Sequence, residues 1–293
     1  MDTQNSLKKK PEMIRARFLF LFLTGLFSIS LLSSFSLKAQ GDLLITPRRV
    51  VFDGKMKSHE INLANTGKET ATYNVSIIQY RMKEDGSFEE IFEPDPGQKF
   101  ADPYIRFFPR TVTLAPNEAQ VVKIQLNKTG ELTDGEYRSH IYFRAVPDQK
   151  PLGEEDLPKD TTSITVKLTP IFGITIPVII RVGESTTNIT LSDLALTLTE
   201  ENQPRLSMTM NRTGNMSVYG DIEVTYLSAQ GKKTQVGQVK GIAVYTPNPT
   251  RKLQLDLTNT QDMDLKSGKI LVTFAEQSDV KEVKLAEAVL TLP

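Results

Sequence analysis

Apolar and polar residues alternate along most of the chain beyond residue 40. A period of two residues places every second side chain on the same face, which is typical of half-buried β-strands. Helical periodicity is weak, and turn residues separate the alternating runs at a spacing of roughly ten residues. The pattern predicts an all-β chain of consecutive β-sandwiches, with about seven strands in each half. The clearest runs are Tyr73, Val75, Ile77; Leu253, Leu255, Leu257; and Ile270, Val272, Phe274.

Two local features refine this organisation. Apolar residues at 50–52 and 61–63 flank Asp53-Gly54, which predicts a loose hairpin. After residue 183 the composition shifts towards Ser and Thr, so we place the boundary between two domains there. The first domain then spans residues 40–183 and the second spans residues 184–293. Each has an ordinary domain size.

The most unusual segment of the chain is the apolar run at residues 164–182. Its even positions are apolar throughout, whereas its odd positions begin polar and become mixed, and an ordinary strand is only five or six residues long. A polar segment with three Pro and seven charged residues, 147–163, leads into it and predicts a long loop. One interpretation is a long strand that lines a core and then links the domains. The other is that residues 166–172 overhang the sheet and pair with another chain.

The N-terminus has the layout of a secretory signal peptide. A basic stretch precedes a 15-residue apolar core at 18–32, and small residues follow, with a plausible cut after Ala39. The apolar stretch is shorter than the roughly 18 residues of a spanning helix. Residues 1–39 are therefore predicted to be a cleavable leader that exports the chain to the periplasm. An uncleaved N-terminal anchor is the alternative.

Charge and composition exclude several classes of function. The whole chain has 35 basic and 35 acidic residues, and removal of residues 1–39 leaves 29 against 33. This balance argues against nucleic acid as a partner, which requires a basic face. Cysteine is absent, so thiol catalysis and Cys-ligated metals are excluded. There is no His-x-x-x-His motif and no Gly-rich phosphate loop, so we expect no cofactor, no metal site and no enzyme activity.

Three polar positions carry candidate chemistry. Arg48 and Arg49 are adjacent, and neighbours on a strand point to opposite faces, so only one is expected to face a cleft. An Arg at a domain junction can hold a carboxylate with two parallel hydrogen bonds, although an ordinary ion pair is the simpler interpretation. His140 lies on a predicted strand with Arg138 on its face, and its neighbour Ser139 points the other way. A Ser–His pair is therefore not expected there.

Four stretches resemble the periplasmic PapD-like pilus chaperones. They are residues 49–54 (RVVFDG), 104–109 together with 112–126, 132–147 and 166–181. The likeness spans nearly all of the mature chain and implies two immunoglobulin-like domains in a boomerang arrangement. It also implies that the donor strand belongs to the first domain.

The resemblance also implies a binding site. In that family a cleft Arg and a cleft Lys hold the C-terminal carboxylate of a subunit, while the donor strand completes the subunit's unfinished sandwich. The Arg falls on Arg49, but the position of the Lys is Pro177 here. Lys123 and Arg181 match other basic positions, and nothing in the sequence assigns either as the replacement. The donor residues fall on Val166, Leu168, Pro170 and Phe172.

These implications lead to one expected function and two alternatives. The chain is expected to be a periplasmic chaperone for fimbrium biogenesis or cell-wall organisation that binds a secreted pilin-like or other surface subunit by strand donation. An outer-membrane usher and self-association through the donor strand are further partners that this function admits. One alternative is an envelope scaffold of the same fold that has lost the carboxylate anchor, which Pro177 favours. An enzyme that depends on His140 is the other.

Overall fold

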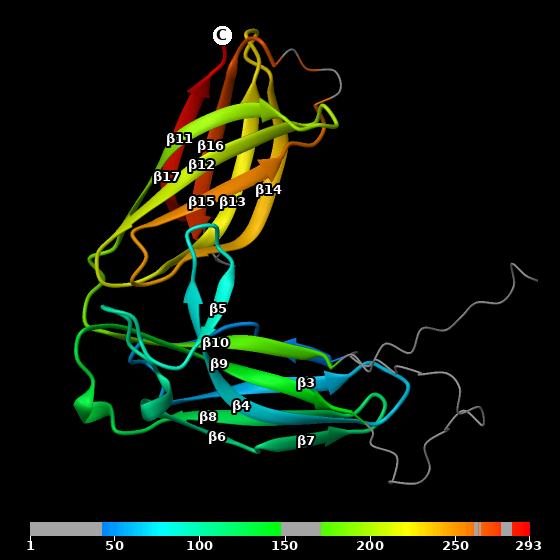
Figure 1. Ribbon diagram of the computed structural model, residues 1–293, viewed down its shortest axis with the longest axis vertical. Helices are drawn as coiled ribbons and strands as arrows, with labels where there is room; N and C mark the ends of the chain where they lie inside the picture. Colours follow the sequence, from blue (N-terminus) through cyan, green and yellow to red (C-terminus); the bar gives the residue numbers. More distant parts are fainter. Residues whose placement is uncertain (1–42, 148–170, 261–262, 264, 277–282) are drawn as a thin grey trace, which may run out of the picture. The chain divides into compact units, whose positions relative to one another are not determined.

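The computed structural model describes residues 43–147, 171–260, 263, 265–276 and 283–293, and strands dominate it (Figure 1). All of these residues fall within one compact unit, Gly41–Pro293. The expected leader, residues 1–39, lies outside the described residues, as do Val166, Leu168 and Pro170. No helix among the described residues has the length and apolar character needed to cross a membrane.

The first sandwich contains ten strands and two short 3-10 helices within its described part. The elements are β1 (Leu43–Thr46), β2 (Val50–Phe52), β3 (Ser58–Asn65), β4 (Ala71–Met82), β5 (Phe88–Ile91), η1 (Asp102–Tyr104), β6 (Ile105–Phe108), β7 (Thr111–Leu114), β8 (Ala119–Leu126), η2 (Thr129–Glu131), β9 (Gly135–Val146) and β10 (Gly173–Val182).

Two sheets enclose the core of this sandwich. One has the order β1-β3-β8-β6, and the other has the order β2-β10-β9-β4-β5 with β7 also paired to β4. The alternation seen in the sequence directs one row of each strand inward. Ile61 of β3 and Ile124 of β8 meet Ile141 of β9 and Val178 of β10 in this core. The inner rows of both sheets thus form one apolar layer.

The prediction of a hairpin across Asp53-Gly54 is wrong. β2 pairs in parallel with β10, whereas β3 pairs with β1 and β8 in the opposite sheet. The chain crosses between the sheets before β2 and again after it, so β2 and β3 do not pair although they are consecutive in sequence. Alternation fixes which side chains face inward, but it does not fix which strand is the neighbour.

The second sandwich has seven strands in its described part. One sheet has the order β11-β12-β15 and the other has the order β14-β13-β16-β17. Its core includes Leu206 of β12 and Phe274 of β16. The strands are β11 (Asn188–Leu198), β12 (Pro204–Thr213), β13 (Val218–Leu227), β14 (Lys233–Val244), β15 (Thr250–Asp256), β16 (Lys269–Glu276) and β17 (Val283–Thr291).

The hairpin formed by β4 and β5 contacts the second sandwich. The backbone N–H of Lys252 donates to the carbonyl of Glu84 at 2.7 Å, and Asn248 Nδ2 donates to the carbonyl of Met82 at 2.6 Å. Met82 also packs with Ala243 and Tyr245 in a small apolar cluster. These contacts make the hairpin part of the junction that surrounds the candidate site.

Candidate functional site

One edge of β10 is paired along its whole length, and the other edge is paired along only part of it. It pairs with β9 over its whole length, from Gly173 opposite Arg144 to Val182 opposite Gly135, and these two strands run side by side in Figure 1. On the other edge β2 pairs only with residues 178–180. Among the described residues, no strand pairs with residues 173–177 on that edge. Unpaired backbone groups of this kind are a template for another strand.

The geometry of the ladder shows which residues face the open edge. The N–H of Ala145 donates to the carbonyl of Phe172 at 2.9 Å, so the backbone groups of Phe172 face β9. Because these directions alternate in an antiparallel pair, the backbone groups of Gly173, Thr175 and Pro177 face the open edge. Pro177 lacks an N–H at a position where β9 needs none, which is where sheets tolerate proline.

The apolar row on the even face of β10 runs out of the core. Ile176 is 3% exposed, Ile174 is 36% exposed and Phe172 is 48% exposed. All three share the face that carries Val178 and Ile180 into the core. The sandwich therefore covers one end of the row and leaves the other end exposed beside the open edge. Of the predicted donor residues, Phe172 alone lies in the described part of the chain.

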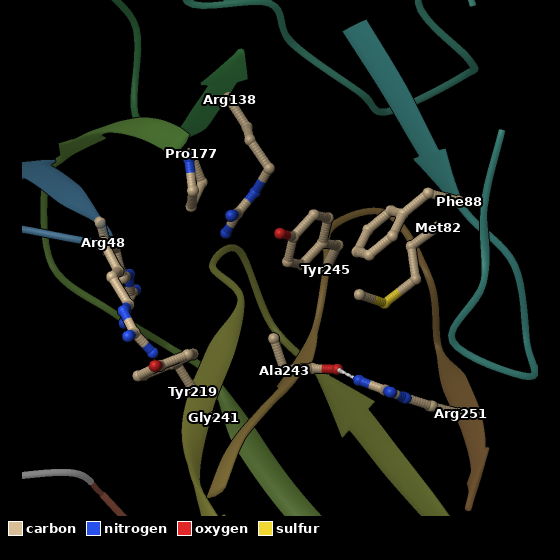
Figure 2. Close-up of a pocket in the computed structure, with 11 residues that line it drawn as sticks. Arg48, Met82, Phe88, Arg138, Pro177, Tyr219, Gly241, Ala243, Tyr245 and Arg251 are labelled. Carbon is tan, nitrogen blue, oxygen red and sulfur yellow. Dashed lines mark hydrogen bonds between the residues drawn. The ribbon is translucent and has the colours of Figure 1, made fainter. Parts of the chain in front are cut away.

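A cavity of about 150 Å³ lies beside the start of β2 and is lined by Arg48, Arg49, Arg138, Pro177 and Tyr219, among others (Figure 2). The guanidinium of Arg49 lies 4.3 Å from the centre of the Tyr219 ring. The prediction that only one of the two adjacent arginines faces a cleft is wrong. Arg48 occupies a bend between β1 and β2, so strand alternation does not apply to it.

Glu136 on β9 is the carboxylate that binds the arginines next to this cavity. Its Oε1 accepts from Arg138 Nη2 at 2.7 Å, and its Oε2 accepts from Arg181 Nε at 3.2 Å and from the Ser217 hydroxyl at 2.7 Å. Burial raises the pKa of Glu136, but Arg138 and Arg181 together with these hydrogen bonds outweigh burial and bring the pKa down to about 2. Glu136 is therefore charged and has both oxygens occupied.

Arg138 is the buried cation of the site. It is 6% exposed, and its guanidinium carbon lies 3.6 Å from the centre of the Tyr245 ring. Its Nη2 donates to Glu136 and also to the Ser217 hydroxyl at 2.7 Å, whereas its buried Nε has no hydrogen-bond partner. Burial lowers the pKa of Arg49 to about 10, and Arg138 and Arg181 add to the effect. Arg138 and Arg181 contact Glu136, and Arg49 is close enough to interact electrostatically with all three groups. Three guanidiniums thus accompany one carboxylate, which favours an anion as a ligand.

The other basic positions considered from the sequence do not complete the site. Lys123 is an exposed residue of β8, in the opposite sheet, where it pairs with Phe108 and Glu60. Arg181 is already bound to Glu136, and its Nη2 donates to the carbonyl of Ser217 at 2.9 Å. The role of Arg138 was missed, although polar residues at 136, 138 and 140 on one face of an otherwise apolar strand are a signal for it.

The surroundings of His140 are those of a buried packing residue. It is buried among the rings of Tyr80, Phe88 and Tyr245, with ring centres 5.0, 6.4 and 6.1 Å away. Burial, and then the charge of Arg138, lower its pKa to about 3. Ser139 faces the other way, where its hydroxyl accepts from the backbone N–H groups of Ala101 and Asp102. Within the described ranges, no cluster of His, Asp and Glu has the arrangement of a metal site.

No model of a protein family matches the sequence, and no curated protein matches it. Solved structures match at low identity. The crystal structure of the YadV chaperone is 14% identical, with 86% of this chain and 100% of that chain covered and a TM-score of 0.43. The CsuC–CsuE chaperone–tip adhesion subunit complex of Acinetobacter baumannii is 12% identical, with 84% and 99% covered and a TM-score of 0.43.

A third match is the complex of the Salmonella enterica SafA pilin with the SafB chaperone. It is 13% identical, with 85% of this chain and 96% of that chain covered and a TM-score of 0.40. Each of the three structures contains a chaperone. The two-sandwich architecture of this chain itself rests on the sheets described above.

Proposed function

We propose that this protein is an exported chaperone that holds an incomplete β-sandwich subunit by donating the start of β10. The observation that carries the proposal is the even row of β10, which leaves the core at Ile174 and is exposed at Phe172 beside an unpaired edge. A subunit strand that adds to this edge gains backbone hydrogen bonds, and its groove takes up the exposed side chains. The unpaired edge and the exposed apolar row thus both fit one ligand, a subunit with an incomplete sandwich.

The gain from the two described side chains is moderate. Phe172 is 48% exposed and Ile174 is 36% exposed, so burying the remaining surface contributes roughly 1 kcal/mol each. Joining two chains and ordering the interface consume several kcal/mol. The other proposed donor residues, Val166, Leu168 and Pro170, lie outside the described residues and extend the same even row in the sequence. A longer apolar row offsets the cost of association.

Arg49 is proposed as the anchor that sets the register of the bound strand. It lies in the cavity at the start of β2, close to the end of β10 that β2 pairs with. A guanidinium holds a carboxylate with two parallel hydrogen bonds, which fixes orientation as well as position. The terminal carboxylate of a subunit is the carboxylate expected at the end of a strand that runs along β10.

The setting of the proposal is the periplasm. The leader at residues 1–39 exports the chain, the domain boundary lies at residues 183–184, and the client is a pilin-like or other surface subunit. An outer-membrane usher would receive the complex, and self-association through β10 would protect the exposed row between clients.

Two adjacent residues provide a matched test. Ile171 and Phe172 are both apolar and are 43% and 48% exposed, but they lie on opposite faces. Phe172→Asp is expected to remove most of the client that co-purifies from an envelope extract, measured by quantitative mass spectrometry, whereas Ile171→Asp retains it. Equal losses of co-purified client from the two variants would contradict strand donation by the even face.

An envelope scaffold of the same fold is the second candidate, and Pro177 in the cavity favours it because proline offers no charge to a carboxylate. The two candidates differ in genetic context. Neighbouring genes for an outer-membrane usher and for subunits with incomplete sandwiches support the chaperone. Their absence supports the scaffold.

A further inference from the structure

The outer face of the four-stranded sheet in the first sandwich carries an exposed aromatic ring among basic residues. Phe108 is 76% exposed at the end of β6, and it lies opposite Lys123 of β8, the strand beside β6 in Figure 1. We propose that Phe108, together with Arg106, Arg110 and Lys123, forms a docking surface for an anionic lipid membrane. The inference goes beyond the proposed function and does not depend on strand donation.

The alternation of β6 places Phe108 outside the core. Ile105 and Phe107 are buried, whereas Arg106 and Phe108 point outward on the same face. β6 is the last strand of its sheet, and within the described residues it pairs with β8 alone. The ring is therefore held in water by the register of the strand, and removing it from water is favourable.

Phe108 is not an isolated apolar residue on this face. Val121 of β8 is 39% exposed and is the diagonal neighbour of Phe108, which pairs with the residue two positions further along β8. Ala119 and Ala64 continue the row across β8 and β3, and Leu44 of β1 ends it with 51% exposure. A connected apolar row with polar neighbours is typical of an interaction surface, unlike a scattered surface residue.

The cations around Phe108 are not neutralised by the chain itself. Arg106 and Lys123 share its outward face, and Arg110 is exposed at the same edge, with its guanidinium 3.9 Å from the centre of the Phe107 ring. Within the described part of the chain, no salt bridge involves any of these three residues. Among the described residues that point outward from the sheet, one is acidic, and it is Glu60 opposite Lys123.

A second exposed phenylalanine shows that exposure is only half of the signal. Phe92 is 88% exposed, but exposed carboxylates lie on both sides of it in sequence, at Glu90 and Glu93. An anionic surface repels these carboxylates and attracts the cations beside Phe108. The two rings thus form a matched pair that differs in the charge of the surroundings.

The charge of the face also selects its occupant. A second copy of the chain, docked face to face, would bring like cations together, with Glu60 alone to offset them on each side. Anionic headgroups supply the opposite charge over a wide area, and the acyl boundary below them accepts an apolar ring. Binding at such a surface increases with the buried apolar area and with the electrostatic attraction, and Phe108 and its basic neighbours provide both.

Fluorescence tests this surface, because the chain has no Trp and an introduced one reports its own surroundings. Phe108→Trp and Phe92→Trp would each be titrated with phosphatidylcholine vesicles, with and without phosphatidylglycerol. The emission of Phe108→Trp is expected to shift to shorter wavelength only with phosphatidylglycerol, as the ring leaves water. The emission of Phe92→Trp is expected to stay unchanged. Added salt should reverse the shift, because it screens the attraction.

Co-sedimentation with the same vesicles measures the contribution of each group. Lys123→Gln should weaken binding about fivefold, the attraction of one Lys near an anionic surface. Lys233→Gln, the same change at an exposed lysine of β14, should have no effect. Phe108→Ser should weaken binding about tenfold through the loss of apolar burial. Phe172→Asp, which changes the proposed donor strand, should leave vesicle binding unchanged.

Several results would overturn the inference. Equal shifts of the two Trp variants, or equal shifts with and without phosphatidylglycerol, would exclude an anionic membrane at Phe108. Binding that Phe172→Asp abolishes and Phe108→Ser retains would assign the vesicle contact to β10. A shift with soluble polyglutamate but not with vesicles would assign the surface to an acidic protein. These assays contain no client, so failure of the docking surface and failure of strand donation are separate outcomes.

Discussion

Ile174 and Ile176 lie on the same face of β10, two residues apart, yet Ile176 is 3% exposed and Ile174 is 36% exposed. The core of the first sandwich therefore ends between these two side chains. β2 pairs with β10 only at residues 178–180, so its pairing ends before Ile176 is reached. The start of β10 therefore has an unpaired edge and, from Ile174 outward, an exposed apolar row, which are the two features that the proposed strand donation requires.

Glu136 should make the stability of the protein sensitive to acid. Its pKa is about 4.5 when unfolded and about 2 in the folded chain, because the arginines and Ser217 outweigh burial. A depressed carboxyl pKa contributes stability above the unfolded pKa, and this contribution is lost as the pH falls from about 4.5 towards 2. Glu136→Gln should lower the free energy of unfolding by about 3 kcal/mol at pH 7, as expected for a broken buried ion pair.

Denaturant titrations at several pH values measure this effect. The difference between the wild type and Glu136→Gln should shrink as the pH falls below 4.5. A difference that stays constant down to pH 2 would show that the charge of Glu136 does not stabilise the junction.

His140 should make folding stability depend on pH in a higher range than Glu136 does. Its folded pKa is about 3, lowered first by burial and then by Arg138, against a usual value of 6.5. The unfolded chain therefore binds the proton more readily between these values, and folding stability falls as the pH drops from about 6.5 towards 3. The maximal slope is about 1.4 kcal/mol per pH unit. Replacing the ring by an apolar one, His140→Phe, should flatten the unfolding free energy between pH 6.5 and 4.5, and parallel curves would refute this role.

The β4–β5 hairpin should stabilise the junction through buried contacts rather than surface charge. Asn248→Ala removes the 2.6 Å hydrogen bond to the carbonyl of Met82 and is expected to cost about 1 kcal/mol. Lys252→Ala removes only an exposed ion pair to Glu84 and keeps the backbone bond, so no measurable change is expected. Equal effects on the unfolding midpoint would show that the hairpin acts through its charges.

The sequence predicted the inward rows of the strands well, because burial leaves a direct mark in every second residue. Ile61, Leu63, Val122 and Ile124 are all buried as the alternation requires. It predicted strand partners poorly, because pairing is a long-range property. The parallel pair of β2 with β10 joins residues more than 120 positions apart, which no local pattern encodes. The described part of the first half contains ten strands, more than the roughly seven expected.

In the candidate site, too, local features could be predicted from the sequence and long-range contacts could not. The resemblance assigned the carboxylate anchor to Arg49, which stays a prediction, and the structure shows only that Arg49 lines the cavity. Arg138 is held by Ser217, which lies 79 positions later in the chain, and by the Tyr245 ring, so its position could not be predicted from its neighbours in sequence. Adjacent Arg48 and Arg49 both line the cavity because a bend interrupts the strand, an irregularity that alternation does not reveal.

A photo-cross-linking scan across the start of β10 tests strand donation most directly. p-Benzoylphenylalanine would be placed singly at positions 171, 172, 174 and 175 in cells that make the native envelope, and cross-linked chains would be identified by mass spectrometry. Strand donation predicts strong cross-links from positions 172 and 174 to an exported protein with an incomplete β-sandwich, and weak ones from positions 171 and 175. Equal yields from both faces, or cross-links confined to the chain itself, would contradict it.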